Sequence, residues 1–332
     1  MREKRIRVGV AGVGDFGRNH ARIYAGLEEA ELVGIVDTNR ERARAVAAEF
    51  GTQALAHLED FAGRAEAVSV AVPTVEHARA GCVLLECGID VLVEKPMAAS
   101  LAEADALMAS AKRAGRVLQV GHLERFNPAM AAVEKIVKQP LFFEVHRLGV
   151  FSPRSLDVDV VYDVMIHDLD ILLALVGAEV TDLRAVGIPI LTDKVDIAHA
   201  RIEFETGAVA NVTASRVSTE RVRKMRFFQA HEYISVDYAR QDALRVSVEE
   251  TTGNVAAGAQ PKFAFEKLPT KPEEPLHAEL GAFLAAVRTR STPRVDGAAG
   301  RRALALADRV MAGIREHAER VQLSAITSQA AQ

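Results

Sequence analysis

Cysteine is scarce in this 332-residue chain, which contains only Cys82 and Cys87. Because these thiols lie five positions apart in one predicted amphipathic helix, we interpret them as packed side chains, and not as a disulfide or half of a metal site. The sequence also lacks a long uninterrupted apolar run and an N-terminal export signal, so it predicts neither a membrane span nor secretion. We therefore expect a protein of the reducing cytoplasm.

A strong charge of one sign is missing as well. The formal net charge is −4, so no overall field favours nucleic acid or an anionic membrane as a partner. Hydrophobic residues make up 49% of the chain and charged residues 26%, which is typical of a globular protein with ample core material. The length favours two domains.

Residues 1–121 alternate between short apolar runs and segments of helical periodicity. The expected strands are 6–11, 31–36, 67–72, 90–94 and 117–120, and the expected helices are 17–27, 40–50, 76–87 and 101–114. Alternation at this spacing predicts βαβ units and a parallel sheet that is buried on both faces. We expect a doubly wound α/β domain of the Rossmann type.

Residues 122–332 have a different pattern, in which strands dominate. Hairpins are expected at 198–216 and 224–238 and a further strand at 243–249, with helices at 128–138, about 159–176, 277–290 and 298–317 and a loop at 251–261. This pattern predicts an α+β domain with an open, mostly antiparallel sheet and helices on one face. The two closing helices are candidates to pack back on the first domain.

A glycine-rich segment, Gly12-Val13-Gly14-Asp15-Phe16-Gly17, follows the first predicted strand and opens a helix. In the G-x-G-x-x-G spacing the first glycine makes the tight turn, the second lets the backbone approach a pyrophosphate, and the third lets the helix pack on its strand. The N–H groups at the helix start would face the phosphates. We expect this segment, with Asp15 and Phe16, to bind a dinucleotide.

A dinucleotide site of this type also needs an acidic residue that binds the ribose. Asp37 follows the second predicted strand, about twenty residues after the last glycine, where a carboxylate accepts hydrogen bonds from the ribose of NAD and repels the extra phosphate of NADP. Thr38 and Arg40 are further expected cofactor contacts, and Arg40 is close enough to soften the preference. NAD is the expected cofactor, and NADP stays open. The alternative is that the glycines and the acid serve only as turn residues.

Glu94, Lys95 and Pro96 follow a predicted parallel strand. The carboxyl end of such a strand is where doubly wound sheets bind ligands. A lysine that points into a nicotinamide crevice can polarise a substrate hydroxyl or take part in proton transfer. The alternative is a surface lysine paired with a neighbouring acid.

A helix near residues 159–176 is apolar almost all round, which predicts burial. Asp163, His167 and Asp170 recur in it at i, i+4 and i+7, on one narrow stripe. Buried ionisable groups are costly unless they line a site. His167 suits general acid–base work, and Asp163 could orient it or bind substrate hydroxyls; a satisfied core histidine and a metal site are the alternatives.

These motifs together resemble the Gfo/Idh/MocA oxidoreductase family, along essentially the whole chain. The resemblance implies an N-terminal Rossmann domain and a C-terminal α+β domain whose open sheet mediates homodimers or homotetramers. It also implies that Lys95 and His167 flank the reacting carbinol, with His167 as the acid/base and Asp163 as a substrate contact. The family's Thr-Pro-x-x-x-His segment reads Val72-Pro73-Thr74-Val75-Glu76-His77 here, with the Thr-Pro order altered. Val72, Pro73 and His77 are expected cofactor contacts, as is Glu94.

Two segments, 121–128 and 163–168, resemble the family's UDP-N-acetylglucosamine 3-dehydrogenases, which supply lipid A biosynthesis. This implies NAD-dependent oxidation of the sugar 3-hydroxyl, with Glu124, Arg125 and Asn127 near the nucleotide sugar and Arg125 suited to a phosphate. The structural alternative is a Glu124–Arg125 interdomain ion pair and a helix start at Asn127. A dehydrogenase of inositol or another sugar, a non-catalytic NAD-binding regulator, and a glycosidase that uses NAD transiently remain competing functions.

Overall fold

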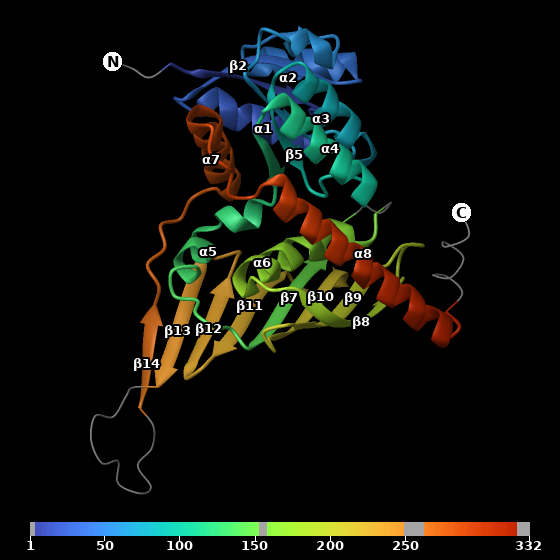
Figure 1. The fold of residues 1–332 in the computed structure, drawn as a ribbon, viewed down its shortest axis with the longest axis vertical. Coiled ribbons are helices and arrows are strands. Elements are labelled where there is room, and N and C mark those ends of the chain that lie inside the picture. The colour runs from blue at the N-terminus through green and yellow to red at the C-terminus, as the bar shows by residue number, and fades with distance from the viewer. Residues whose placement is uncertain (1–3, 153–157, 249–261, 324–332) are drawn as a thin grey trace, which may run out of the picture. The chain divides into compact units, whose positions relative to one another are not determined.

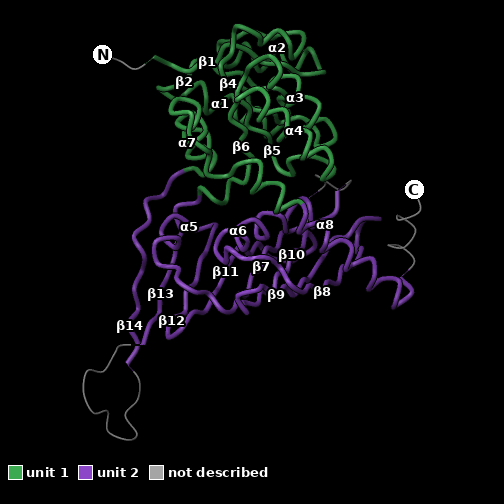
Figure 2. Tube along the Cα trace, viewed as in Figure 1, with its two compact units in different colours: residues 1–126, 274–304 green, residues 127–273, 305–332 purple. Residues whose placement is uncertain are grey.

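The computed structural model describes residues 4–152, 158–248 and 262–323. The chain divides into two compact units, the first formed by residues 1–126 and 274–304 and the second by residues 127–273 and 305–332 (Figure 2). The predicted loop at 251–261 lies outside the described residues. Among the helices that are described, none combines the length and apolar character that crossing a membrane requires.

The first unit contains a sheet of six parallel strands in the order β3-β2-β1-β4-β5-β6. The strands are β1 (Ile6–Ala11), β2 (Ala30–Val36), β3 (Ala54–Leu55), β4 (Ala67–Val70), β5 (Asp90–Glu94) and β6 (Leu118–Gly121). This order confirms the predicted Rossmann fold and places a topological switch point between β1 and β4, where such sheets bind their ligands. Short β3 was not predicted, and β4 ends two residues earlier than expected.

Helices cover this sheet, and one of them comes from far along the chain. The helices between the strands are α1 (Asp15–Gly26), α2 (Arg40–Glu49), α3 (His77–Glu86) and α4 (Leu101–Ala114), with short helical turns η1 (Leu58–Phe61), η2 (Thr74–Glu76) and η3 (Leu123–Phe126). Helix α7 (Pro275–Thr289) lies beside α1 in Figure 1. Its Leu280 and Phe283 are buried in one core with Val8 and Tyr24, so a C-terminal segment completes the first unit.

The second unit is built on a mixed sheet of eight strands in the order β14-β13-β12-β11-β7-β10-β9-β8. The strands are β7 (Phe142–Val150), β8 (Val180–Ile188), β9 (Ile197–Phe204), β10 (Val209–Ser218), β11 (Val222–Gln229), β12 (Glu232–Asp237), β13 (Asp242–Val248) and β14 (Phe263–Lys267). Every neighbouring pair is antiparallel except β7 with β10. The predicted, mostly antiparallel sheet is confirmed, but β7, β8 and β14 were missed.

Helices lie on one face of this sheet, as Figure 1 shows for α6 (Ile166–Val176) and the C-terminal part of α8 (Gly297–Arg320). Side chains alternate along the strands, so Val145, Val212 and Phe227 are fully buried beneath that layer, as the two-residue period of a strand requires. Helix α5 (Pro128–Val133) ends five residues before the predicted Lys138. The opposite face carries partly exposed side chains.

Candidate active site

The glycine-rich turn between β1 and α1 has the geometry that a dinucleotide needs. Gly12 has φ +82, and a Cβ on it would lie 2.6 Å from the carbonyl oxygen of Ala71. A Cβ on Gly17 would lie 1.8 Å from the carbonyl oxygen of Gly12, so only glycine allows the helix to pack this closely. Around Gly14 a Cβ would meet no atom within 4 Å, which leaves open the space through which a pyrophosphate approaches the backbone.

The start of α1 offers donors to the same space. Gly14 is the N-cap residue and provides no side-chain cap for the helix, and the N–H groups at the start of a helix are groups that bind phosphates. Asp15 lies in the first helical turn. Phe16 is 40% exposed and packs edge-on against buried His20, with ring centroids 5.3 Å apart. The turn therefore fits the pyrophosphate of NAD.

Asp37 lies just past the end of β2 and is bound to this turn. Its carboxylate accepts hydrogen bonds from the backbone N–H groups of Val13, at 2.8 Å, and Asn39, at 2.7 Å. The guanidinium that binds it belongs to Arg42, at 3.1 and 2.8 Å, whereas Arg40 and Thr38 are exposed. Burial alone would raise the pKa of Asp37, but the hydrogen bonds from Arg42, Val13 and Asn39 outweigh it, so the pKa lies below its ordinary value.

Glu94 and Lys95 stand at the carboxyl end of β5. Glu94 is 7% exposed and pairs with the Nε2 atom of His20 at 3.0 Å. A Cβ on neighbouring Gly121 would lie 2.7 Å from its carboxylate, so a glycine makes room for this acid. Lys95 is half-buried, and its peptide bond to Pro96 is cis.

His77 connects this turn to the segment that follows β4. Its Nδ1 atom lies 2.8 Å from the carbonyl oxygen of Pro96, and its Nε2 atom lies 2.8 Å from that of Val72. Burial lowers the pKa of His77 against the opposing effect of the two carbonyl contacts. His77 thus links the turn that carries Lys95 to the end of β4, while Val72 is half-buried and Pro73 is exposed.

The residues expected near a nucleotide sugar lie where the first unit ends and the second begins. Glu124 is 5% exposed and Arg125 is half-buried, both in η3. Asn127 is the N-cap of α5, accepting the N–H of Ala129 at 3.1 Å and donating to the carbonyl oxygen of Tyr238 at 3.1 Å. These contacts match the structural alternative for Asn127.

The predicted polar stripe lies on two kinds of helix. Residues Val161–Met165 form a π-helical turn, and α6 follows from Ile166. Because a π turn is wider than an α turn, the period of 3.6 residues assumed for the stripe does not hold through it. Asp163 and His167 are half-buried, whereas Asp170 is buried. Single π turns inside helices are frequent at functional sites.

A buried ion pair holds this helix to the sheet. Arg147 on β7 binds both carboxylate oxygens of Asp168, with its Nε atom at 2.7 Å and its Nη2 atom at 2.8 Å. The guanidinium lies 5.2 Å from the centroid of the Tyr238 ring. Sequence reasoning missed this pair because Asp168 lies outside the i, i+4, i+7 stripe and β7 was not predicted.

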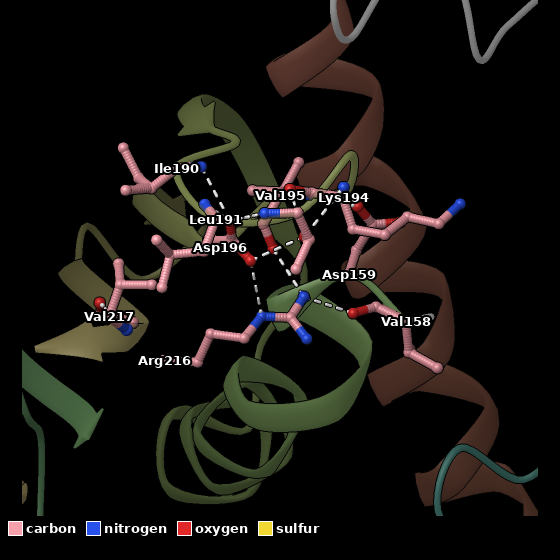
Figure 3. Close-up of polar contacts among 11 residues, drawn as sticks. Val158, Asp159, Ile190, Leu191, Lys194, Val195, Asp196, Arg216 and Val217 are labelled. Atoms are coloured by element: carbon pink, nitrogen blue, oxygen red, sulfur yellow. Dashed lines mark hydrogen bonds and ion pairs between the residues drawn. The ribbon is translucent and has the colours of Figure 1, made fainter. Parts of the chain in front are cut away.

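A second network fixes the start of the same helix (Figure 3). Asp196 is fully buried and accepts the backbone N–H groups of three consecutive residues at 2.6–2.9 Å, those of Ile190, Leu191 and Thr192. Arg216 pairs with Asp196 at 3.1 Å and donates to the carbonyl oxygens of Val195 and Val158. Val195 in turn bonds to Asp159 and Val160, so the entry to the π turn is tied to β9 and β10.

Among the residues that the structure describes, no three or more His, Cys, Asp or Glu side chains are grouped so that they could hold a metal ion. The arrangement fits cofactor binding in the first unit and acid–base chemistry in the second.

Comparison with known proteins identifies both units. Residues 6–122 match the model of the Gfo/Idh/MocA oxidoreductase family with an NAD-binding Rossmann fold, and residues 146–231 match the Gfo/Idh/MocA C-terminal domain. UDP-N-acetylglucosamine 3-dehydrogenase from Acidithiobacillus ferrooxidans is 38% identical over 316 residues, which cover 95% of this chain and 99% of that protein. The scyllo-inositol 2-dehydrogenase (NAD(+)) of Bacillus subtilis is 31% identical over 235 residues, 65% of this chain and 69% of that enzyme.

Solved structures give the same result. A structure of the Acidithiobacillus enzyme superposes with a TM-score of 0.87, covering 94% of this chain and 98% of that one. Levoglucosan dehydrogenase in complex with NADH is 21% identical and reaches 0.82 over 94% and 98% of the two chains, a likeness of fold. The chain therefore belongs to the Gfo/Idh/MocA family of oxidoreductases, and its first unit is an NAD-binding Rossmann domain.

Proposed function

We propose that this protein is an NAD-dependent dehydrogenase that oxidises the 3-hydroxyl of UDP-N-acetylglucosamine to a 3-keto sugar. The observation that carries the proposal is the 38% identity to UDP-N-acetylglucosamine 3-dehydrogenase, which extends over 99% of that enzyme. An acid–lysine pair at the carboxyl end of β5 and a histidine beside a π turn supply groups that suit this chemistry.

The first unit binds the cofactor in this proposal. The N–H groups at the start of α1 hold the pyrophosphate where Gly14 leaves space, and the Asp37 carboxylate accepts hydrogen bonds from the adenosine ribose. When bound there, NAD⁺ would supply the acceptor for the hydride that leaves the sugar carbon. Glu94 and His77 hold the turn that carries Lys95 beside this cofactor.

Lys95 and His167 act on the substrate hydroxyl. The Lys95 ammonium donates a hydrogen bond to the oxygen and stabilises the negative charge that develops on it. The neutral His167 imidazole takes the hydroxyl proton as the C–H bond breaks, and Asp163 orients the sugar or the imidazole. These two roles need no metal ion.

Residues of the last turn before the second unit select the nucleotide sugar. Arg125 carries a planar guanidinium that suits a diphosphate oxygen, and Glu124 suits a sugar hydroxyl. Asn127 shapes this segment as the N-cap of α5 and orients its neighbours.

The protein works in the cytoplasm as a homodimer or homotetramer in this proposal, with UDP-N-acetylglucosamine as its partner molecule. Its product would be aminated on a route to amino-substituted lipid A. Support for the assembly comes from the open face of the eight-stranded sheet, where the Phe142 and Phe228 rings stack and the Phe228 ring makes a tilted contact with Tyr233 across adjacent strands. Exposed apolar rows of this kind mark contact surfaces.

A panel of sugars tests the reaction. The purified protein is mixed with NAD⁺ and either UDP-N-acetylglucosamine, UDP-glucose, scyllo-inositol or myo-inositol, and NADH absorbance is followed while products are analysed. The proposal requires NADH formation with UDP-N-acetylglucosamine at a kcat/KM at least about tenfold above the other compounds. Preference for an inositol would replace the substrate, silence with every compound would favour a non-catalytic regulator, and free sugar without NADH would indicate a glycosidase.

A further inference from the structure

Arg216 reaches from β10 to the chain segment that enters the π turn. Its side chain is 9% exposed, and its Nη2 atom donates to the carbonyl oxygens of Val195, at 3.0 Å, and Val158 (Figure 3). Val195 in turn accepts the N–H of Val160 at 2.9 Å and donates its own N–H to the Asp159 carboxylate at 2.8 Å. One buried guanidinium therefore fixes the residues that directly precede the π turn.

Asp196 holds this guanidinium in place. Its Oδ1 atom lies 3.1 Å from the Nε atom of Arg216, and its Oδ2 atom accepts the backbone N–H groups of residues 190–192 at 2.6–2.9 Å. Burial alone would raise the pKa of Asp196, but the hydrogen bonds from these backbone groups outweigh it, so the pKa lies below its ordinary value. A charged Asp196 therefore fixes the guanidinium relative to the sheet.

The proposed catalytic groups follow directly from this anchored segment. The carbonyl oxygen of Asp159 accepts the N–H groups of Tyr162 and Asp163, each at 3.1 Å, so it closes the first turn of the helix. The Tyr162 hydroxyl donates to Asp308 on α8 at 2.7 Å, which holds the same turn from its other side. Since π turns are rare, these contacts at its start decide where the turn places Asp163 and His167.

We infer that Arg216 is a positioning residue for His167 and Asp163 in the proposed dehydrogenase reaction. It acts through the main chain of the segment that enters the π turn. A planar guanidinium reaches a carboxylate and two carbonyl oxygens at once, whereas the compact ammonium of a lysine does not reproduce this fork. The inference rests on the proposed function, because His167 is the proposed proton acceptor.

Arg216→Lys is the test variant, because it keeps the charge beside Asp196 and removes the fork. The matched control is Arg245→Lys, which makes the same exchange on β13 of the same sheet, where Arg245 pairs with Glu232 and Glu266. For each protein, kcat is measured as a function of pH with the sugar that the wild type oxidises. Hydrogen–deuterium exchange of residues 158–165 is measured without any sugar.

In Arg216→Lys, we expect kcat to fall by about 10–10², because small displacements of reacting groups have effects of this size. The acid limb of the pH profile of kcat should move by about half a pH unit or more, since the imidazole meets altered surroundings. A loss of folded protein would instead lower kcat by the same factor at every pH. Backbone N–H groups of the π turn should exchange at least about tenfold faster, and Arg245→Lys should change each quantity by less than about twofold.

An unchanged kcat and pH profile in Arg216→Lys, or equal changes in Arg245→Lys, would overturn the inference. If Arg216→Lys does not fold, Asp196→Asn is judged by the same criteria, because it keeps an oxygen for the backbone N–H groups and removes the charge that holds the guanidinium. A wild type that oxidises no sugar would refute the proposed function and, with it, this role of Arg216. An active wild type with an unaffected Arg216→Lys variant would refute the role of Arg216 alone.

Discussion

Individual side chains of this protein have two kinds of role. Some hold other groups in place, and one is proposed to move a proton. His77 belongs to the first kind, because its two ring nitrogens contact the carbonyl oxygens of Val72 and Pro96 at 2.8 Å. His167 is proposed for the second kind, since an imidazole can exchange a proton near neutral pH. We therefore expect replacement of His77 and replacement of His167 to have different effects.

Replacement of the proposed proton acceptor should affect turnover and leave cofactor binding intact. We expect His167→Asn to lower kcat with UDP-N-acetylglucosamine by about 10² or more, because general base catalysis contributes that much. The dissociation constant of NADH, measured by calorimetry, should stay within about twofold of the wild type. Undiminished turnover in this variant would remove His167 from the mechanism.

Burial of His77 predicts that acid destabilises the fold. Because burial lowers the pKa of His77 in the folded state, the unfolded chain binds the proton first as the pH falls below about 6.5. The stability that the folded state gains from a neutral His77 is complete above that pH and is lost as the pH falls toward the lowered pKa of His77. His199 has a lowered pKa, from burial and from His146, and acts in the same direction.

Thermal unfolding of the wild type and His77→Gln, at about pH 7.5 and about pH 5.5, measures this effect. The wild-type Tm should fall more over this range than the Tm of the variant, in which the ionisable ring is gone. His199 is present in both proteins and so cancels in the comparison. Equal falls would show that His77 does not contribute to the pH dependence.

At the scale of helices and strands, local patterns predicted most elements but not the central strand of the second sheet. Strand β5 and helix α4 have the predicted bounds, because an apolar run between two acids defines the strand locally, and a Ser100 cap with a closing Gly115 defines the helix. Strand β7 contains Arg147 at a buried position and pairs in parallel with β10, more than sixty residues away. Neither the buried charge nor the distant partner is visible in a local pattern.

The candidate site was predicted to a similar extent and for similar reasons. The Gly12-x-Gly14-x-x-Gly17 turn and Asp37 follow a spacing that the backbone geometry requires, so the sequence located them. Arg42 was missed in favour of Arg40, since position along the chain does not tell which guanidinium reaches a carboxylate. The π turn was missed because periodicity arguments assume 3.6 residues per turn.

The ion pair between β7 and α6 should be one of the main stabilising contacts of the second unit. Its side chains are 6% and 1% exposed, and loss of one partner leaves a buried charge. We expect Arg147→Ala to lower the free energy of unfolding by about 3–5 kcal/mol in urea titrations. The control Arg226→Ala breaks the exposed pair with Glu144, at 4.0 Å, and should lower the free energy of unfolding by less than about 1 kcal/mol. Equal losses of unfolding free energy in the two variants would contradict this account.

At the scale of the whole molecule, the open face of the second sheet predicts self-association. Phe142, Phe228, Tyr233, Val246 and Phe265 are direct neighbours in register across five strands and form one apolar row. Phe228 is 37% exposed and Phe265 72% exposed. A second copy of the chain would bury this row.

Light scattering after size exclusion should give the mass of a dimer or tetramer for the wild type. Phe228→Glu should lower that mass, because it places a charge within the apolar row. Val321→Glu is the control, since Val321 is 53% exposed and lies outside the row. A monomeric wild type, or an unchanged mass in Phe228→Glu, would contradict the proposed assembly.

The central claim is that a hydride leaves carbon 3 of UDP-N-acetylglucosamine and reaches NAD⁺ on this protein. The most direct test uses UDP-N-acetylglucosamine with deuterium at carbon 3, followed by mass spectrometry of the reduced cofactor. The proposal predicts one deuterium per NADH formed, together with a 3-keto sugar nucleotide as the other product. Reduced cofactor without deuterium, or no reduced cofactor at all, would contradict it.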